Sequence, residues 1–165
     1  MFQKFYPNNY VESTYHIDFE KYYQNGYQGI IFDIDNTLVF HGVVASKQAV
    51  TLFRELHNLG FKTCLISNNK EQRVKKFAEE VNSPYIYKAG KPKIRSYVKA
   101  MEMMGTDQAH TFFVGDQIFT DVYGANRTGI HSILVKPLGP KEEIQIVLKR
   151  YLEKIVLYFY EKNRK

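Results

Sequence analysis

The segment Asp33-Ile34-Asp35-Asn36-Thr37 carries two carboxylates two residues apart, directly after the apolar run 29–32. That run has the composition of a buried strand, and side chains two residues apart in an extended chain point to the same side. Two like charges held together repel each other, and a divalent cation would relieve that cost. Mg²⁺ favours carboxylate oxygens together with the oxygens of a substrate phosphate. The pentad therefore predicts a magnesium-dependent site for phosphate transfer.

Three further polar clusters follow apolar runs later in the chain: Ser67-Asn68-Asn69 after 61–66, Lys91 after 85–87, and Gly115-Asp116 through Asp121 after 111–114. Phosphoryl transfer needs an in-line nucleophile, a positioned metal and positive charge on the phosphoryl oxygens. An aspartate can form an aspartyl-phosphate, and a second carboxylate can act as general acid and base. A hydroxyl and a lysine can hold the phosphoryl oxygens. A Ser-Asn pair is also a common helix cap and Gly-Asp a common turn, so the ordered set carries the prediction.

The elements that would position these residues alternate along the chain. Apolar runs predict strands at 29–32, 61–66, 85–87, 111–114 and 132–135. Amphipathic patterns predict helices at 46–58, 70–81, 92–104 and 120–127. Such alternation implies right-handed crossovers and an α/β fold, a three-layer, doubly wound, mainly parallel sheet. The ligand site of such a sheet lies beyond the carboxyl ends of its strands, where all four polar clusters fall.

Over residues 29–136 the ordered motifs resemble the haloacid dehalogenase (HAD) superfamily of phosphohydrolases. The resemblance implies that Asp33 is the nucleophile, that Asp35 is the general acid and base, and that Lys91 stabilises the phosphoryl group. It implies a Mg²⁺ cofactor held by Asp33, the backbone carbonyl of Asp35, Asp116 and Asp121, the last often as an outer ligand. The expected contacts to the substrate phosphate are Thr37, Ser67, Asn68 and Lys91.

Two gaps in which HAD proteins often insert a cap domain are short here, at 38–45 and 70–90. We therefore expect an open, capless site, which suits a phosphate on a large substrate. The spelling Asp-Ile-Asp-Asn-Thr-Leu and the lead-in Pro7-Asn8-Asn9-Tyr10-Val11 resemble YqeG-like members of HAD subfamily IIIA. Their relatives include phosphatidylglycerophosphate phosphatases, which implies a phosphorylated lipid as substrate and an anionic phospholipid surface as partner.

Length and composition bound these expectations. The 165 residues fit a single domain, 1–165, with an aromatic-rich extension at 1–28 and a helix at 139–162. The net charge is +6, and residues 62–99 hold ten Lys and Arg against three Asp and Glu. Such a region attracts anions, but no aromatic residues interleave in the manner of single-strand binders, so nucleic acid is a disfavoured partner. Cys64 reads as a small buried hydrophobe. The first nine residues lack a secretory signal, which predicts a cytoplasmic protein, attached peripherally to a membrane if its substrate is a lipid.

The helix predicted at 139–162 has an apolar stripe and a basic face. The stripe comprises Ile144, Val147, Leu148, Tyr151, Leu152, Ile155, Val156 and Phe159, and the basic face comprises Lys149, Arg150, Lys154 and Lys162. We expect most of the stripe to pack on the core, with membrane contact as the alternative. Three functions stay open: a peripheral lipid phosphatase, a phosphatase acting on a nucleic-acid end or small phosphometabolite, and a non-catalytic binding protein. The oligomeric state is left open.

Overall fold

A six-stranded parallel sheet forms the centre of the protein, whose computed structural model describes residues 2–140 and 143–164. The strands are β1 (Asn9–Val11), β2 (Gly29–Phe32), β3 (Lys62–Ile66), β4 (Tyr85–Ile86), β5 (Thr111–Gly115) and β6 (His131–Val135). Their order across the sheet is β1-β6-β5-β2-β3-β4, and every neighbouring pair is parallel. The predicted α/β class with a parallel sheet is confirmed.

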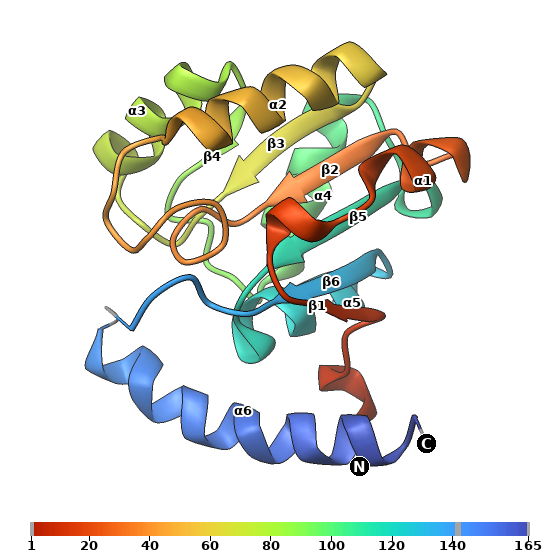
Figure 1. Ribbon diagram of the computed structural model, residues 1–165, viewed down its shortest axis with the longest axis vertical. Helices are drawn as coiled ribbons and strands as arrows, with labels where there is room; N and C mark the ends of the chain where they lie inside the picture. The colour runs from red at the N-terminus through yellow and green to blue at the C-terminus, as the bar shows by residue number, and fades with distance from the viewer. Residues whose placement is uncertain (1, 141–142, 165) are drawn as a thin grey trace.

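Helices cover both faces of the sheet, as Figure 1 shows. They are α1 (Phe19–Gln24), α2 (Lys47–Leu59), α3 (Glu71–Val81), α4 (Ile94–Met104), α5 (Tyr123–Thr128) and α6 (Ile144–Lys162). Single turns at Gln3–Phe5, Thr14–His16 and Gln108–His110 are 3₁₀, and Ile118–Val122 forms a π-helical turn. Helix α2 shows why the sequence sets these limits. The Ser46 hydroxyl accepts from the Ala49 N–H at its start, and Gly60 adopts a left-handed conformation at its end.

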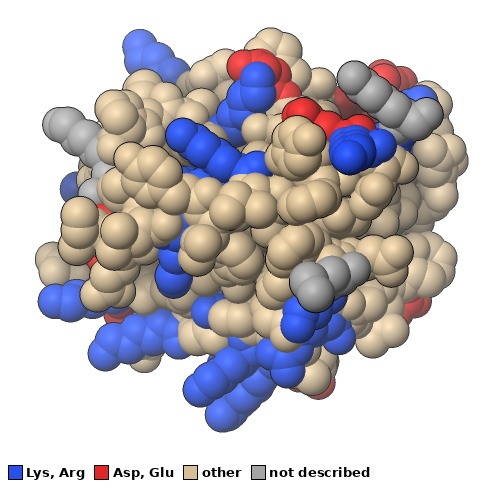
Figure 2. Space-filling model, turned by 90° about the horizontal axis from the view of Figure 1, so that it is seen from below, with Lys and Arg blue, Asp and Glu red and all other residues tan. Residues whose placement is uncertain are grey.

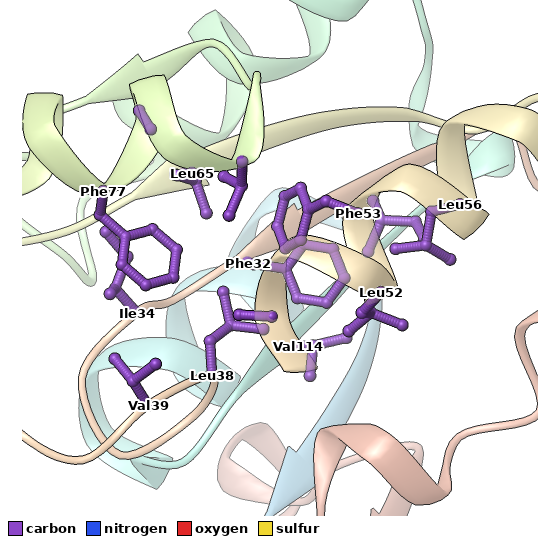
Figure 3. Packing of buried hydrophobic residues seen from close by; sticks show 14 of the residues in the cluster. Phe32, Ile34, Leu38, Val39, Leu52, Phe53, Leu56, Leu65, Phe77 and Val114 are labelled. Carbon is purple, nitrogen blue, oxygen red and sulfur yellow. The ribbon is translucent and has the colours of Figure 1, made fainter. Parts of the chain in front are cut away.

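Successive side chains of a strand point to opposite faces of the sheet, so each face has its own hydrophobic core. Ile30 and Phe32 pack with the apolar sides of α2 and α3, whereas Ile31, between them, packs with α4. Figure 3 shows Phe32, Phe53 and Phe77 gathered on the first side. Because all four residues of β2 are buried, the carboxylates that follow it start from a rigid central strand.

The N-terminal segment contributes a strand that the sequence pattern did not indicate. β1 pairs with β6 in parallel, with Tyr10 opposite Leu134, and so becomes the edge of the sheet. Three residues are too few to show a two-residue alternation, so this strand is set by tertiary pairing. Differences elsewhere are small: the predicted helix at 120–127 begins as the π-helical turn at Ile118, and α6 begins at Ile144. The sequence predicted that this last helix starts at 139, and residues 141–142 of the predicted range lie outside the described part of the structure.

No inserted domain covers the carboxyl edge of the sheet among the described residues. A single loop, 33–46, leads from β2 to α2, and only α3 and β4 lie between residue 66 and Lys91. The expected capless architecture is therefore confirmed. Within the same described ranges, we find no helix with the length and apolar character needed to cross a lipid bilayer.

Candidate active site

The carboxyl ends of β2 and β5 bring the first and last motifs together at the centre of the sheet. Phe32 lies opposite Val114 in the two strands, so Asp33 and Asp116 emerge side by side where the strand order reverses. Carboxylate oxygens of Asp33, Asp116 and Asp121 lie within 4.8 Å of one another, and all three side chains are buried. Asp33 and Asp116, which lie 83 positions apart in the sequence, thus belong to one acidic cluster.

Thr37 links two of these carboxylates. Its Oγ1 lies 3.1 Å from Asp33 Oδ2 and 3.0 Å from Asp116 Oδ1. A hydroxyl has one proton to donate, so it can satisfy only one of two ionised carboxylates at a time. Thr37 is fully buried. Its hydroxyl therefore braces the acidic cluster, and the expected contact of Thr37 with the substrate phosphate stays a prediction.

The second motif supports its neighbours through both asparagines. The Asn68 amide accepts from the Lys91 N–H at 2.8 Å and donates to the Lys91 carbonyl at 3.3 Å. Its side chain therefore fixes the backbone of Lys91. Asn68 also lines the pocket, and its expected contact with the substrate phosphate stays a prediction. The Asn69 Nδ2 donates to Asp35 at 3.3 Å. Ser67 is buried, and its hydroxyl accepts from the Asn69 N–H at 3.1 Å.

Lys91 lies between two of the acids. Its Nζ is 2.6 Å from Asp33 Oδ1 and 2.7 Å from Asp121 Oδ1, and its side chain is buried. Burial alone would lower the pKa of Lys91, but the charges of Asp121 and Asp33 outweigh burial and raise that pKa above its usual value. The lysine is therefore a fixed cation at the acidic cluster. Lys91 follows Asp33 by 58 residues in the sequence. The two side chains meet because β4 returns the chain to the carboxyl edge of the sheet.

Both carboxylate oxygens of Asp121 accept hydrogen bonds. Its Oδ1 accepts from Lys91, and its Oδ2 accepts from the backbone N–H groups of Asp116 and Gln117, each at 3.1 Å. The π-helical turn Ile118–Val122 aims the side chain back at the loop that follows β5. With both oxygens occupied, Asp121 orients Lys91 and Asp116.

Burial makes the acidic cluster costly when it is fully ionised. Desolvation raises the pKa of Asp33 well above its ordinary value; Lys91 opposes this shift, and the charges of Asp121 and Asp116 add to it. Burial and Asp121 likewise raise the pKa of Asp116 to about 6. Hard carboxylate oxygens that are buried and crowded in this way fit a divalent metal ion, which would restore the ionised forms.

Asp35 has a different environment from Asp33. It accepts from the Gly42 N–H at 2.8 Å and from Arg73 at 3.0 Å. Burial would raise the pKa of Asp35, but these bonds, together with Asn69, lower it below the ordinary value. Arg73 was not among the residues predicted from the sequence. Its position on the first turn of α3 after Ser67 gave the only available signal, a basic residue close behind a motif.

Helix α6 contributes a further residue that the sequence pattern placed elsewhere. Arg150 forms an ion pair with Asp116 and another with Glu153 at 2.9 Å, and Glu153 accepts from the Ile118 N–H at 2.7 Å. The sequence pattern placed Arg150 on the basic face of this helix, opposite the apolar stripe. In the structure its side chain turns inward to the buried carboxylates.

These residues line a pocket of about 370 Å³ at the carboxyl edge of the sheet. Asp33, Asp35, Ser67 and Lys91 line it together with residues that sequence reasoning missed, namely His41, Gln117, Thr120, Glu143, Gln145, Ile146 and Lys149. The last four belong to α6 or immediately precede it. A terminal helix carries no motif that tells which surface it packs on, so its contribution to the pocket could not be read from the sequence.

Comparisons with known proteins agree with this geometry. A family model described as "HAD-hyrolase-like" matches residues 88–137. The chain is 37% identical over 159 residues to "Probable phosphatase YqeG" of Bacillus subtilis (strain 168), with 95% of this chain and 92% of that protein covered. It is 25% identical to phosphatidylglycerophosphate phosphatase 1, chloroplastic/mitochondrial, of Arabidopsis thaliana, covering 90% of this chain but 48% of that protein. A solved HAD-superfamily hydrolase from Ehrlichia chaffeensis superposes with a TM-score of 0.55 at 13% identity, over 78% of this chain and 97% of that one.

The parallel sheet with carboxylates after its two central strands, the family match and the YqeG relative together identify an α/β phosphatase of the HAD type. The chain belongs to the HAD superfamily. YqeG of Bacillus subtilis is a relative that matches it over nearly the whole length of both chains. The buried acids Asp33, Asp116 and Asp121 are compatible with the divalent metal site of such an enzyme.

Proposed function

We propose that this protein hydrolyses phosphomonoesters with Mg²⁺ and an aspartyl-phosphate intermediate on Asp33. The observation that carries the proposal is the setting of Asp33, a buried carboxylate at the pocket with Lys91 on one oxygen and Thr37 on the other. The cation Lys91 lies where it can neutralise a phosphoryl group transferred to Asp33. Mg²⁺, held by Asp33, Asp116 and the Asp35 carbonyl with Asp121 behind them, would supply further positive charge for the phosphate oxygens.

Asp35 is proposed as the general acid and base. Its bonds to Gly42 and Arg73 favour the ionised carboxylate, the form that activates water in the second step. In the first step the same carboxyl must donate a proton to the leaving oxygen. Arg73 would thus set the balance between the two forms, which makes it a positioning residue for Asp35.

Arg73→Met tests this role. Loss of the guanidinium should raise the pKa of Asp35, because the remaining burial opposes the charged form. A larger share of Asp35 would then be protonated at each pH, so the descending limb of kcat/KM should move to higher pH. The pH profile of the variant checks this shift, and Lys75→Met, on the same helix but exposed, is the matched control. An unchanged descending limb would show that Arg73 does not control proton donation by Asp35.

Lys91→Met should lower kcat by a factor on the order of 10²–10³, the usual cost of losing one preorganised electrostatic partner. The methyl thioether fills a similar volume without charge. Removing one partner of a buried ion pair also destabilises the fold, by about 3–5 kcal/mol. Kinetics should therefore be measured at a temperature where circular dichroism shows the variant folded. An exposed lysine in the same loop, Lys93→Met, should leave kcat unchanged; a silent Lys91→Met would contradict the assignment.

The substrate is proposed to be large or lipid-linked, such as phosphatidylglycerophosphate. No inserted domain covers the pocket within residues 2–140 and 143–164. The loop that supplies His41 to the pocket exposes Phe40, Val43 and Val44, with 55% of Phe40 accessible. Exposed apolar side chains at the rim suit a substrate with an apolar part next to its phosphate. The Arabidopsis relative is named for this lipid phosphate.

We further propose that residues 1–165 act as one domain, because β1 pairs with β6 and α6 reaches the pocket.

A panel of phosphomonoesters with Mg²⁺ tests the substrate. It should include phosphatidylglycerophosphate in mixed micelles, a sugar phosphate, a nucleotide and a 5′-phosphorylated oligonucleotide. The lipid should give the highest kcat/KM. A preference for a water-soluble ester would favour the alternative, a soluble phosphatase for which the exposed lysines between residues 62 and 99 attract the substrate. Absence of turnover on every ester would favour a non-catalytic binding protein.

A further inference from the structure

Helix α6 presents two unlike sides, and only one of them is used by the fold. Val156 and Tyr160 are buried against the N-terminal segment and the turn Ile118–Val122. The ring of Tyr160 lies 5.5 Å from that of Tyr6. On the same side, Arg150 and Glu153 bind Asp116 and Ile118. The body of the protein therefore holds α6 through Val156, at one margin of the apolar stripe, and through the side that carries Arg150, Glu153 and Tyr160.

The opposite side is an exposed apolar surface, which we call the outer face of α6. It comprises Ile144, Leu148, Tyr151, Leu152, Ile155 and Tyr158, whose accessible fractions run from 50% to 71%. Phe159, at its margin, is 38% accessible, and its ring lies 5.6 Å from that of Phe2. The spacing of three and four residues puts the residues of the outer face on one continuous stripe along the 19-residue helix. The expectation that most of the stripe packs on the core is wrong, because Val156 is the only member buried among those described.

Basic residues flank the outer face. Lys149, Lys154 and Lys162 are exposed, whereas of the acids of α6 Glu153 is buried and Glu161 is exposed. Figure 2 looks at the molecule from the side of α6 and shows Lys and Arg side chains around a broad uncharged area. The Nζ of Lys154 lies 5.2 Å from the centre of the Tyr151 ring, so an aromatic side chain and a cation stand together at the border. Such a helix, apolar on one side with lysines along its edges, has the design of an interfacial helix.

We propose that the outer face of α6 docks on the surface of an anionic phospholipid bilayer, with its apolar side chains among the headgroups and its lysines on the phosphates. Charge favours this occupant over a second copy of the chain. A second copy would bring the same lysines to the interface, where like charges repel, whereas anionic lipids attract them. Tyr151 and Tyr158 suit the boundary between water and lipid, because each has an apolar ring and a polar tip.

Docking in this manner would also place the pocket at the membrane. Gln145, Ile146 and Lys149 of α6 form part of the pocket wall. The ring of Phe40, in the exposed loop after β2, lies against Gly139, which precedes α6 in the sequence. A phosphorylated headgroup could then reach Asp33 without leaving the bilayer. This inference deepens the lipid-linked substrate of the proposed function, but vesicle binding can be measured without any turnover.

The test is cosedimentation with vesicles of phosphatidylglycerol and phosphatidylcholine at low salt. The full chain should bind vesicles rich in phosphatidylglycerol at least tenfold more tightly than pure phosphatidylcholine, and added salt should weaken this binding. Leu148→Asp/Leu152→Asp should reduce it at least tenfold. The matched control is Ile94→Asp/Val98→Asp on α4, an exposed apolar pair with the same four-residue spacing, and it should bind as the unaltered protein does. Lys154→Glu/Lys162→Glu should remove the preference for phosphatidylglycerol.

Three outcomes would overturn the proposal. The unaltered protein could fail to bind, or Leu148→Asp/Leu152→Asp could bind equally well. Alternatively, analytical ultracentrifugation could show a dimer that this same variant converts to a monomer, which would assign the outer face to a second copy. Hydrolysis of a small water-soluble phosphomonoester by each variant keeps the two proposals apart. It should be unchanged in Leu148→Asp/Leu152→Asp, and an unaltered protein that hydrolyses the soluble ester but does not bind vesicles would overturn the docking alone.

Discussion

Asp33→Asn should lower kcat on every accepted phosphomonoester by a factor on the order of 10⁴–10⁶, the scale seen when a covalent nucleophile is removed. An amide is a poor nucleophile and a weaker metal ligand than a carboxylate. The fold should survive, because the change is nearly isosteric. Burial already raises the pKa of Asp33, so a neutral group at this position relieves repulsion with Asp121 and Asp116.

The comparison variant is Asp107→Asn, in which an exposed aspartate that caps the turn at Gln108–His110 is changed in the same way. It should retain full activity, since asparagine caps equally well. Both variants should melt near the unaltered protein in circular dichroism. Substantial hydrolysis by folded Asp33→Asn protein would remove Asp33 from the chemistry and leave the pocket without a nucleophile.

Removal of divalent metal should abolish turnover, and Mg²⁺ should restore it. The buried carboxylates of Asp33, Asp116 and Asp121 stand within 4.8 Å of one another, and Lys91 and Arg150 offset only part of their charge. Mg²⁺ accepts such oxygen ligands at short distance, while Ca²⁺ prefers looser and higher coordination and should support the reaction poorly. Activity measured after EDTA treatment, and again with each metal in excess, checks this result.

A variant of the proposed metal site tests the same Mg²⁺ dependence without a chelator. Asp116→Asn should require a higher Mg²⁺ concentration for half-maximal activity, and calorimetry should show weaker Mg²⁺ binding, whereas Asp107→Asn should change neither. Mg²⁺ should also raise the melting temperature of the unaltered protein, because a ligand that binds only the folded state stabilises it. Full activity in the presence of the chelator would contradict the metal-dependent mechanism.

The strands and the acidic motifs were predictable because their signals are local. β2 is a fully buried strand of four apolar residues, and Asp33 follows it directly. A parallel sheet then forces the ends of β2 and β5 together, which brings Asp33 to Asp116 without any further information. The chemistry of the site rests on residue types whose spacing to an apolar run is fixed.

What could not be predicted depends on contacts between distant segments. β1 is too short to show a pattern, and it exists because β6 offers a free edge. Helix α6 has an apolar stripe that indicated a core-facing side, yet the ion pairs of Arg150 and Glu153 turn that stripe outward. Thr37 and Asn68 belong to recognisable motifs, but only the folded arrangement shows that they brace the carboxylates and Lys91.

The measurement that tests the central claim most directly is mass spectrometry of the protein quenched in acid during turnover. Aspartyl-phosphates survive brief exposure to acid, so the peptide containing Asp33 should carry the added mass of one phosphoryl group while substrate is present and lose it when substrate is exhausted. Asp33→Asn protein should carry none. A phosphoryl group on any other residue, or turnover without phosphorylation of the Asp33 peptide, would contradict the account.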